Sequence, residues 1–327
     1  MSARFEIPAY DPDLIADVGR MPSAVTNEQQ FREWRAEPLP GLDELRPALD
    51  ELGLVHEEHV VAVPGGKMVL SVVRPRTVAG RLPALYLIHG GGMIAGNRFG
   101  SFLPDVLTWI VDHGIVVVSP EYTLAPEQRA PQAAMECYAG LRWVAEHAID
   151  LSIDDDRLVL AGGSGGGGLA ASVSLLARDN GGPGLLAQML LCPQLGDRHD
   201  TVSSEQFTLA NGAIDPWPSE TNRYAWNALL GEGHEDADVS IYASPARADD
   251  LSGLPQAFID VGGNEVFRDA DLAYASRLWQ GGVNVEVHVW PGGYHSFDFM
   301  VPDAPVSIAA KAARTSWLER IFAAAAG

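Results

Sequence analysis

Short apolar segments alternate with longer segments of helical spacing over most of this chain. From about residue 55 onward, the apolar segments are rich in Val, Ile and Leu and are only a few residues long. Continuous short apolar runs are typical of strands that are buried on both faces, as in a parallel sheet. We predict strands at 60–63, 68–74, 84–89, 115–119, 158–161, 189–192, 257–261 and 283–290. We predict helices at 102–112, 132–147, 169–178, 270–280 and 308–325.

The order of these elements defines the expected fold. Pro64, Gly65 and Gly66 separate the first two strands and favour a hairpin. Strand and helix then alternate over about two hundred residues. This alternation predicts an α/β protein with a doubly wound, mostly parallel sheet of about eight strands.

Two regions do not follow the alternation. Residues 1–52 are helix-like and rich in Trp, Arg and Glu, and residues 196–251 form a long polar and aromatic insertion between two strands. Connections of this length are often lids or binding loops. We therefore expect both regions to form one helical cap over the main domain, which comprises residues 53–195 and 252–327. A peripheral helical decoration without ligand contact is the alternative.

A glycine-rich turn follows the predicted strand at 158–161. The sequence from Gly162 to Gly166 reads G-x-S-x-G with Ser164 at its centre and a helix behind it. In a sharp strand-to-helix turn, flanking glycines relieve the clashes of a strained central residue and present its hydroxyl above the sheet. Ser164 is therefore a candidate nucleophile at a helix N-terminus, where developing negative charge is favoured.

The same glycines allow two other interpretations. Gly163, Gly165 and Gly168 also fit the dinucleotide pattern G-x-G-x-x-G. That pattern normally opens the first βα unit and is followed by an acidic residue at the end of the next strand. Here it lies in the middle of the chain, and the next strand ends at Cys192 without a carboxylate. The third interpretation is a flexible glycine loop without chemistry.

A second glycine motif favours acyl transfer. The predicted strand at 84–89 ends in His89-Gly90-Gly91-Gly92, about 75 residues before Ser164. Acyl transfer builds an oxyanion that needs preorganised backbone donors. We expect the N–H groups of Gly91, Gly92 and Gly165 to form this oxyanion hole. An ordinary glycine-rich turn is the alternative.

The base and the acid are expected near the C-terminus. Of the nine histidines, only His295 lies on a loop after both Ser164 and the last predicted strand. The order Ser, acid, His is the one that α/β-hydrolases use. Glu265 and Asp269 both follow the strand at 257–261 and are candidates for the acid, whereas Asp260 lies within that strand. We prefer Glu265, because Asp269 falls in the first turn of the next predicted helix.

At this point the chain resembles the bacterial hormone-sensitive-lipase family of esterases, from about residue 83 to the C-terminus. H-G-G-G at 89–92, E-Y-T-L-A-P-E at 121–127 and G-G-N-E-V-F-R-D at 262–269 are similar to family motifs. The resemblance implies a Ser164–His295–Glu265 triad and hydrolysis of short- to medium-chain acyl esters. Four positions depart from the family pattern: Gly163 and Gly165 replace an Asp and an Ala, Thr123 replaces an Arg, and Glu265 replaces an Asp.

The insertion supplies the expected substrate pocket. Aromatic side chains beside an active edge provide apolar contacts. We expect Met93, Phe207, Trp217, Tyr224 and Trp226 to contact the substrate. A lactonase or an amidase with the same triad, or a non-catalytic ligand receptor on the same scaffold, would also fit the sequence.

Composition limits partners and location. The formal charge of −21 disfavours nucleic acid and anionic membranes. No apolar run approaches a membrane span and no secretory signal is recognised, so we expect a cytoplasmic protein. Cys137 and Cys192 lie in apolar segments and are interpreted as buried free thiols. We expect no metal or organic cofactor and a small-molecule ester as the partner; the sequence leaves the oligomeric state open, with a homodimer as one option.

Overall fold

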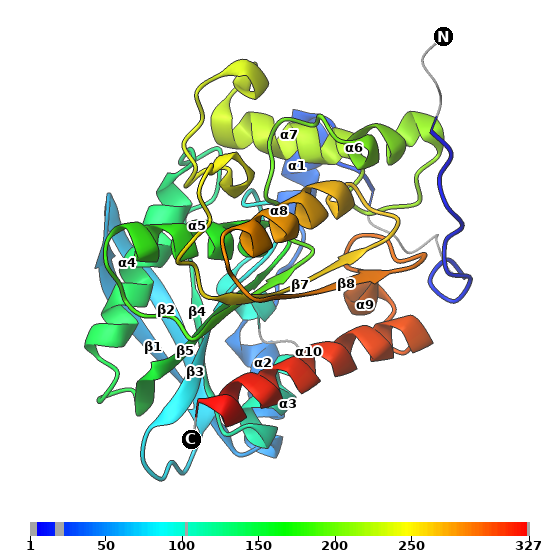
Figure 1. Cartoon of the computed structure of the whole chain (residues 1–327). Helices are drawn as coiled ribbons and strands as arrows, with labels where there is room; N and C mark the ends of the chain where they lie inside the picture. Colours follow the sequence, from blue (N-terminus) through cyan, green and yellow to red (C-terminus); the bar gives the residue numbers. More distant parts are fainter. Residues whose placement is uncertain (1–4, 17–22, 102–103, 326–327) are drawn as a thin grey trace.

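The computed structural model describes residues 5–16, 23–101 and 104–325 (Figure 1). Within these residues a sheet of eight strands forms in the order β1-β2-β4-β3-β5-β6-β7-β8. The strands are β1 Leu54–Val63, β2 Gly66–Pro75, β3 Leu82–Ile88, β4 Val116–Pro120, β5 Ile153–Gly163, β6 Ala187–Leu191, β7 Gln256–Gly262 and β8 Val285–Trp290. β2 is antiparallel to both of its neighbours, and all pairs from β4 to β8 are parallel. The predicted fold class is confirmed.

The hairpin at the start of the sheet is also confirmed, but its first strand is longer than predicted. β1 begins at Leu54, six residues before the predicted start, and pairs with β2 as far as Pro75. The extra residues include the polar run from His56 to His59. An edge strand with one solvated face tolerates such residues, so its pattern lacks the continuous apolar run that marks the inner strands.

Helices cover both faces of the sheet (Figure 1). The helices on one face are α4 Gln132–Glu146, α5 Gly165–Asp179 and α8 Arg268–Gln280. Those on the other face are α2 Leu42–Glu51, α3 Pro104–Asp112 and α10 Pro305–Ala324. Successive residues of β3 alternate between the two cores: Tyr86 joins the first and Leu85 the second. The first two residues of the helix predicted at 102–112 lie outside the described residues.

The remaining segments lie together above the carboxyl edge of the sheet. They comprise α1 Glu28–Arg35, α6 Val202–Gln206 and α7 Ser219–Leu230 (Figure 1), and short turns η3 Leu209–Asn211, η4 His234–Asp236 and η5 Pro245–Arg247. The Phe31 and Tyr224 rings lie 5.6 Å apart, and the backbone N–H of Val25 donates to Thr221 Oγ1. Residues distant in sequence therefore pack into one layer. α2 belongs instead to the sheet, because Leu45 and Leu49 are buried in its second core.

Two further elements follow the sheet: η2 Arg98–Ser101 after β3, and α9 Phe297–Met300 after β8. In the part of the chain that the structure describes, no helix has the length and apolar character needed to cross a bilayer.

Candidate active site

Ser164 occupies a sharp turn between β5 and α5. Its φ is 56° and its ψ is −124°, in the region that side chains rarely adopt. Backbone bonds hold this conformation: the N–H of Ser164 donates to Leu191 O at 2.8 Å, and Gln194 N–H donates to Ser164 O at 3.0 Å. The side chain is 9% exposed. The turn therefore presents a single hydroxyl at the N-terminus of a 15-residue helix.

The two glycines beside Ser164 differ in the space around them. A Cβ added to Gly165 would lie 2.7 Å from Met93 N and 2.9 Å from Gly92 N, so the loop after β3 would have to move. A Cβ added to Gly163 would meet nothing nearer than 3.9 Å. Gly165 is therefore required by the close approach of two backbone segments, whereas Gly163 is not.

The loop at 89–92 lies directly above this turn. Gly91 and Gly92 have φ values of 103° and 61°, which glycine adopts at little cost. Within the described residues, no hydrogen bond is found from the N–H groups of Gly91, Gly92 or Gly165. The structure thus brings the three predicted oxyanion donors together, and their N–H groups have no hydrogen-bond acceptor among the described residues.

Tyr122 holds the loop from behind. Its hydroxyl donates to His89 O at 2.9 Å, and its ring stacks on His89 with centroids 4.2 Å apart. Burial lowers the pKa of His89 to about 4, so its ring is neutral at physiological pH. The Nδ1–H then donates to Gly90 O at 2.9 Å. The segment E-Y-T-L-A-P-E thus supports the glycine loop.

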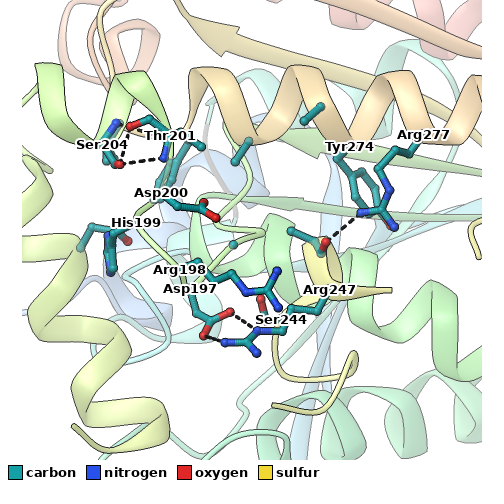
Figure 2. A pocket seen from close by; sticks show the side chains of 17 residues that line it. Asp197, Arg198, His199, Asp200, Thr201, Ser204, Ser244, Arg247, Tyr274 and Arg277 are labelled. Carbon is teal, nitrogen blue, oxygen red and sulfur yellow. Dashed lines mark hydrogen bonds and ion pairs between the residues drawn. The ribbon is translucent and has the colours of Figure 1, made fainter. Parts of the chain in front are cut away.

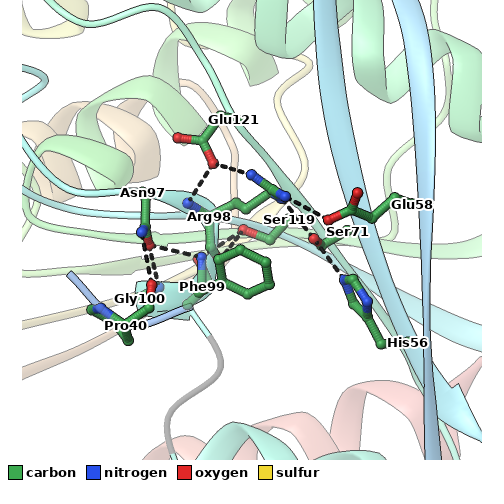
Figure 3. A network of polar contacts seen from close by, with 11 residues as sticks. Pro40, His56, Glu58, Ser71, Asn97, Arg98, Phe99, Gly100, Ser119 and Glu121 are labelled. Atoms are coloured by element: carbon green, nitrogen blue, oxygen red, sulfur yellow. Dashed lines mark hydrogen bonds and ion pairs between the residues drawn. The ribbon is translucent and has the colours of Figure 1, made fainter. Parts of the chain in front are cut away.

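A partly exposed ion-pair network fixes the residues that follow the loop (Figure 3). Arg98 donates to Glu121 at 2.7 Å, to Glu58 at 2.5 Å and to Ser71 at 2.8 Å. His56 shares the Ser71 hydroxyl at 2.9 Å. These contacts connect η2 to β1, β2 and the end of β4, so the polar run of the edge strand has a structural role.

His295 and Glu265 continue the contacts of Ser164. His295 Nε2 lies 2.9 Å from Ser164 Oγ, and His295 Nδ1 lies 2.5 Å from Glu265 Oε2. The other carboxylate oxygen of Glu265 accepts the N–H of Gly262 at 2.6 Å. His295 is 4% exposed and Glu265 is fully buried. The structure therefore joins the three residues in one hydrogen-bonded chain.

The electrostatics of His295 follow from these neighbours. Burial lowers the pKa of His295, whereas the Cys192 sulfur and the Glu265 carboxylate raise it, and the net direction is upward. Burial also raises the pKa of the Cys192 thiol, which is therefore neutral. We accordingly assign the upward shift of His295 to the carboxylate, which stabilises the imidazolium.

The second candidate for the acid, Asp269, and the strand residue Asp260 have different partners. Asp269 accepts a hydrogen bond from Arg268 at 2.7 Å and one from the backbone N–H of Ser203 at 2.7 Å. Asp260 lies in β7 and accepts from Arg314 at 2.7 Å. Neither carboxylate has a contact with His295 among the described residues, so Glu265 is the one that the structure places on the imidazole.

Trp217 is the insertion residue that reaches this centre. A Cβ added to Gly92 would lie 2.3 Å from the Trp217 ring, and the ring centroids of Trp217 and His295 are 6.2 Å apart. Trp34 of α1 packs edge-on against Trp217 at 6.1 Å. The backbone N–H of Trp217 donates to Asp215 Oδ1 at 2.7 Å, and burial raises the pKa of Asp215 to about 7.

The other predicted substrate residues have contacts elsewhere. Tyr224 donates to Glu28 at 3.0 Å, Trp226 is fully buried within the core, and Phe207 packs under the Arg268 guanidinium. Met93 is 3% exposed; its backbone lies against Gly165, and it lines a small cavity to which Ser164 does not contribute. Of the five predicted residues, Trp217 is the one that the structure places against both the glycine loop and His295.

A cavity of about 190 Å³ lies beside the centre (Figure 2). Its labelled walls come from the start of the insertion, from η5 and from α8, and include Asp200, Arg247 and Tyr274. Phe267 also lines it and packs edge-on against His295 at 5.1 Å. Neither Ser164 nor His295 lines the cavity, whereas Phe267 both lines it and contacts His295.

Three residues near the centre were missed by the sequence analysis. Cys192 is partly exposed, unlike the buried Cys137, and its Sγ lies within 4.8 Å of ligand atoms of Glu265 and His295. The expectation of two buried thiols is therefore corrected for Cys192. Cys192 directly follows β6, which pairs with β5, the strand that leads to Ser164. Its position in the sequence could therefore have placed it near Ser164. No sequence pattern marks Asp215 or Asp271 as residues near the centre, because their burial depends on how the chain packs.

Comparison with known proteins identifies the class and then the family. A family model described as alpha/beta hydrolase fold matches residues 85–299. Carboxylesterase NlhH of Mycobacterium tuberculosis is 34% identical over 256 residues, which cover 76% of this chain and 78% of the relative. Esterase LipI of the same species is 30% identical over 307 residues, which cover 91% and 92%.

Solved structures agree with these relatives. A bacterial heroin esterase superposes with a TM-score of 0.85 at 34% identity and covers 96% of this chain and 98% of its own. Esterase LipW from Mycobacterium marinum gives 0.83 at 28% identity, with 96% of each chain covered. The protein is thus an α/β-hydrolase. More narrowly, it belongs to the bacterial hormone-sensitive-lipase family, which confirms the resemblance seen in its motifs.

The contrast between the two elbow glycines leads to a stability prediction. Gly165→Ala should destabilise the protein by about 1–3 kcal/mol, because the added methyl overpacks two backbone segments. Gly163→Ala should be neutral or stabilising by up to about 1 kcal/mol, because it only restricts the unfolded chain. Urea unfolding of both variants beside the parent measures the difference. Equal stability of the two variants would contradict the steric argument.

Proposed function

We propose that this protein is a serine carboxylester hydrolase that acts on short- to medium-chain acyl esters. The observation that carries the proposal is the hydrogen-bonded chain from Ser164 through His295 to Glu265, beneath a glycine loop with uncommitted N–H groups. The printed names of the relatives, carboxylesterase and esterase, support the same activity.

In the proposed mechanism, Ser164 Oγ attacks the ester carbonyl while His295 Nε2 takes its proton. The tetrahedral intermediate collapses, His295 returns the proton to the leaving alcohol, and an acyl-enzyme remains. Water that is deprotonated by His295 then releases the carboxylic acid. Glu265 holds the imidazole with its proton on Nδ1 and stabilises the imidazolium that forms twice in each cycle.

The oxyanion that forms at each addition step would be stabilised by backbone donors. We propose the N–H groups of Gly91, Gly92 and Gly165 for this role. Their positions are fixed before substrate binds, because Tyr122 and the buried His89 support the loop. Preorganised donors in a site with little water contribute strongly to catalysis, since they need no reorientation.

The cap is proposed to comprise α1 and residues 196–251, with α2 assigned to the sheet domain. Trp217 is the proposed wall of the acyl site, with Met93 behind the glycine loop. Phe207, Tyr224 and Trp226 then act within the cap by supporting its packing. The space at Ser164 is confined by Trp217 and by Phe267, and this confinement favours short over long acyl chains. The expectation of a cytoplasmic location rests on the sequence alone, and a homodimer stays one option for the oligomeric state.

Ser164→Ala should abolish hydrolysis of p-nitrophenyl butyrate without changing the fold. Loss of a triad residue leaves roughly 10³–10⁴-fold catalysis over the uncatalysed rate. The parent should also be labelled stoichiometrically at Ser164 by an organophosphate, as shown by peptide mass spectrometry. Retained turnover in Ser164→Ala, or labelling at another residue, would overturn the assignment.

The same assay separates the alternatives. A lactone series and an anilide series, measured beside p-nitrophenyl esters, should give lower kcat/KM than the esters. A higher value for lactones or anilides would reassign the protein as a lactonase or an amidase. A protein that binds esters and turns over none of the three would be a receptor on this scaffold.

The choice of acid is tested by Glu265→Gln and Asp269→Asn. Glu265→Gln should lower kcat by up to about 10⁴-fold, because the wrong imidazole tautomer is then favoured. Asp269→Asn should stay within about tenfold of the parent, since Asp269 contacts Arg268 and Ser203 instead. A large loss in Asp269→Asn beside near-normal Glu265→Gln would exchange the two roles.

The pH profile of the same variants checks the electrostatics. His295 is active as a base only when it is neutral, so kcat/KM should rise with pH through its pKa. Because Glu265 raises that pKa, the acid limb of the parent should lie above the ordinary histidine value, about 6.5. The limb should move to lower pH in the residual activity of Glu265→Gln. An unchanged limb would show that the carboxylate does not set the pKa.

Trp217→Ala should widen the acyl site. The ratio of kcat/KM for p-nitrophenyl octanoate to that for the butyrate should rise by about tenfold or more, since each methylene accommodated contributes about 1–3 kcal/mol. Trp279→Ala is the control, because Trp279 is 52% exposed on α8. An equal profile in both variants would show that the cap does not shape the site.

A further inference from the structure

A mixed set of metal-binding side chains lies inside the candidate active site. Ligand atoms of Cys192, Glu265 and His295 all lie within 4.8 Å of one another. They come from three loops at the carboxyl edge of the sheet, after β6, β7 and β8 respectively. The proposed mechanism uses Glu265 and His295, but it gives the Cys192 thiol no role.

The side chains fit one class of cation. Thiolate, imidazole and carboxylate together suit Zn²⁺, which takes three protein ligands and leaves a fourth position open. A thiolate and a carboxylate also neutralise the two positive charges, as a largely buried site requires.

The surroundings of this cluster also include a buried carboxyl group without a hydrogen-bond partner. Asp271 of α8 is fully buried, and neither of its carboxylate oxygens has a hydrogen-bond partner within the described residues. Its electrostatic neighbours are Glu265, Cys192 and His295. Burial raises the pKa of the Asp271 carboxyl well above its usual range, so it is neutral without a cation, and a cation bound nearby would favour its ionised form.

We propose that Cys192, His295 and Glu265 form an inhibitory site for Zn²⁺. The ion takes the position of the proton between His295 Nδ1 and Glu265 Oε2, and these atoms separate from 2.5 Å to the roughly 3.4 Å that tetrahedral ligands require. The thiol loses its proton to solvent as the Zn–S bond forms. The proton displaced from Nδ1 is balanced by one taken up at Nε2, so one proton leaves per zinc bound.

The tautomer explains the inhibition. With Nδ1 on the metal, the neutral imidazole carries its proton on Nε2, the nitrogen that lies 2.9 Å from Ser164 Oγ. It can then no longer accept the proton of the Ser164 hydroxyl. Zinc would therefore block the base while leaving the nucleophile and the glycine loop in place. The inhibition rests on the proposed esterase function, whereas metal binding does not.

Binding is tested on the full chain with Zn²⁺ by titration calorimetry and with Co²⁺ by absorption spectroscopy. The parent should bind one Zn²⁺ per chain, and Co²⁺ should give a thiolate-to-cobalt charge-transfer band. Cys192→Ala should lose the band and bind Zn²⁺ more than about 100-fold more weakly, because loss of a direct ligand exceeds the 10–100-fold effect of outer partners. Cys192→Ser is a second variant that retains the size of the side chain and should also lose the band.

Two controls separate the explanations. Cys137→Ala removes the other cysteine, which is fully buried in α4, and should leave zinc affinity and the band unchanged. Ser164→Ala should bind Zn²⁺ as tightly as the parent, so binding can be measured even if the esterase proposal fails. In the activity assay, Zn²⁺ should inhibit the parent, and EDTA should restore its activity. The same Zn²⁺ concentration should leave the activity of Cys192→Ala unchanged. Equal zinc affinity of Cys192→Ala and the parent, or no cobalt–thiolate band in the parent, would overturn the site.

Discussion

The conformation of Ser164 is the constraint on which the rest of the site depends. A residue with a side chain at φ 56° costs about 1–3 kcal/mol unless its surroundings determine it. Here the backbone bonds to Leu191 and from Gln194 fix both sides of the peptide. The strand before the turn is central in the sheet and the helix behind it is buried, so the strain is held by the core. A rigid position of the Ser164 hydroxyl follows from the packing rather than from flexible glycines.

The glycine loop and the cap are built on that fixed point. Gly165 lets the loop after β3 approach the turn to a distance that excludes a methyl group. Gly92 in turn lets the Trp217 ring lie against the loop, and Trp34 of α1 packs against Trp217. The approach of the loop requires that Gly165 has no Cβ, and the approach of the Trp217 ring requires the same of Gly92. The family motif usually has an Ala at the position of Gly165, and in this chain the glycine permits the observed approach of the loop.

The sheet and the site could be predicted from sequence to different extents. Inner strands such as 115–119 form continuous apolar runs, so all eight strands were located. The polar half of β1 was missed, because its side chains are stabilised by partners such as Arg98 that are distant in sequence. Ser164, His295 and Glu265 could be proposed because motif order in an α/β sheet fixes which loops meet. The contacts of Trp217, and the burial of Asp215, depend on how the insertion packs, and no local pattern encodes that.

Glu265 illustrates how a longer side chain can take the place of an aspartate. The extra methylene adds a rotatable bond, and a freely rotating carboxylate would hold an imidazole poorly. Both of its oxygens have partners here: one accepts the Gly262 N–H and the other contacts His295 Nδ1. The carboxylate is fully buried, so water does not compete for either oxygen. The Gly262 amide therefore compensates for the longer arm, and the backbone of β7 becomes part of what orients the histidine.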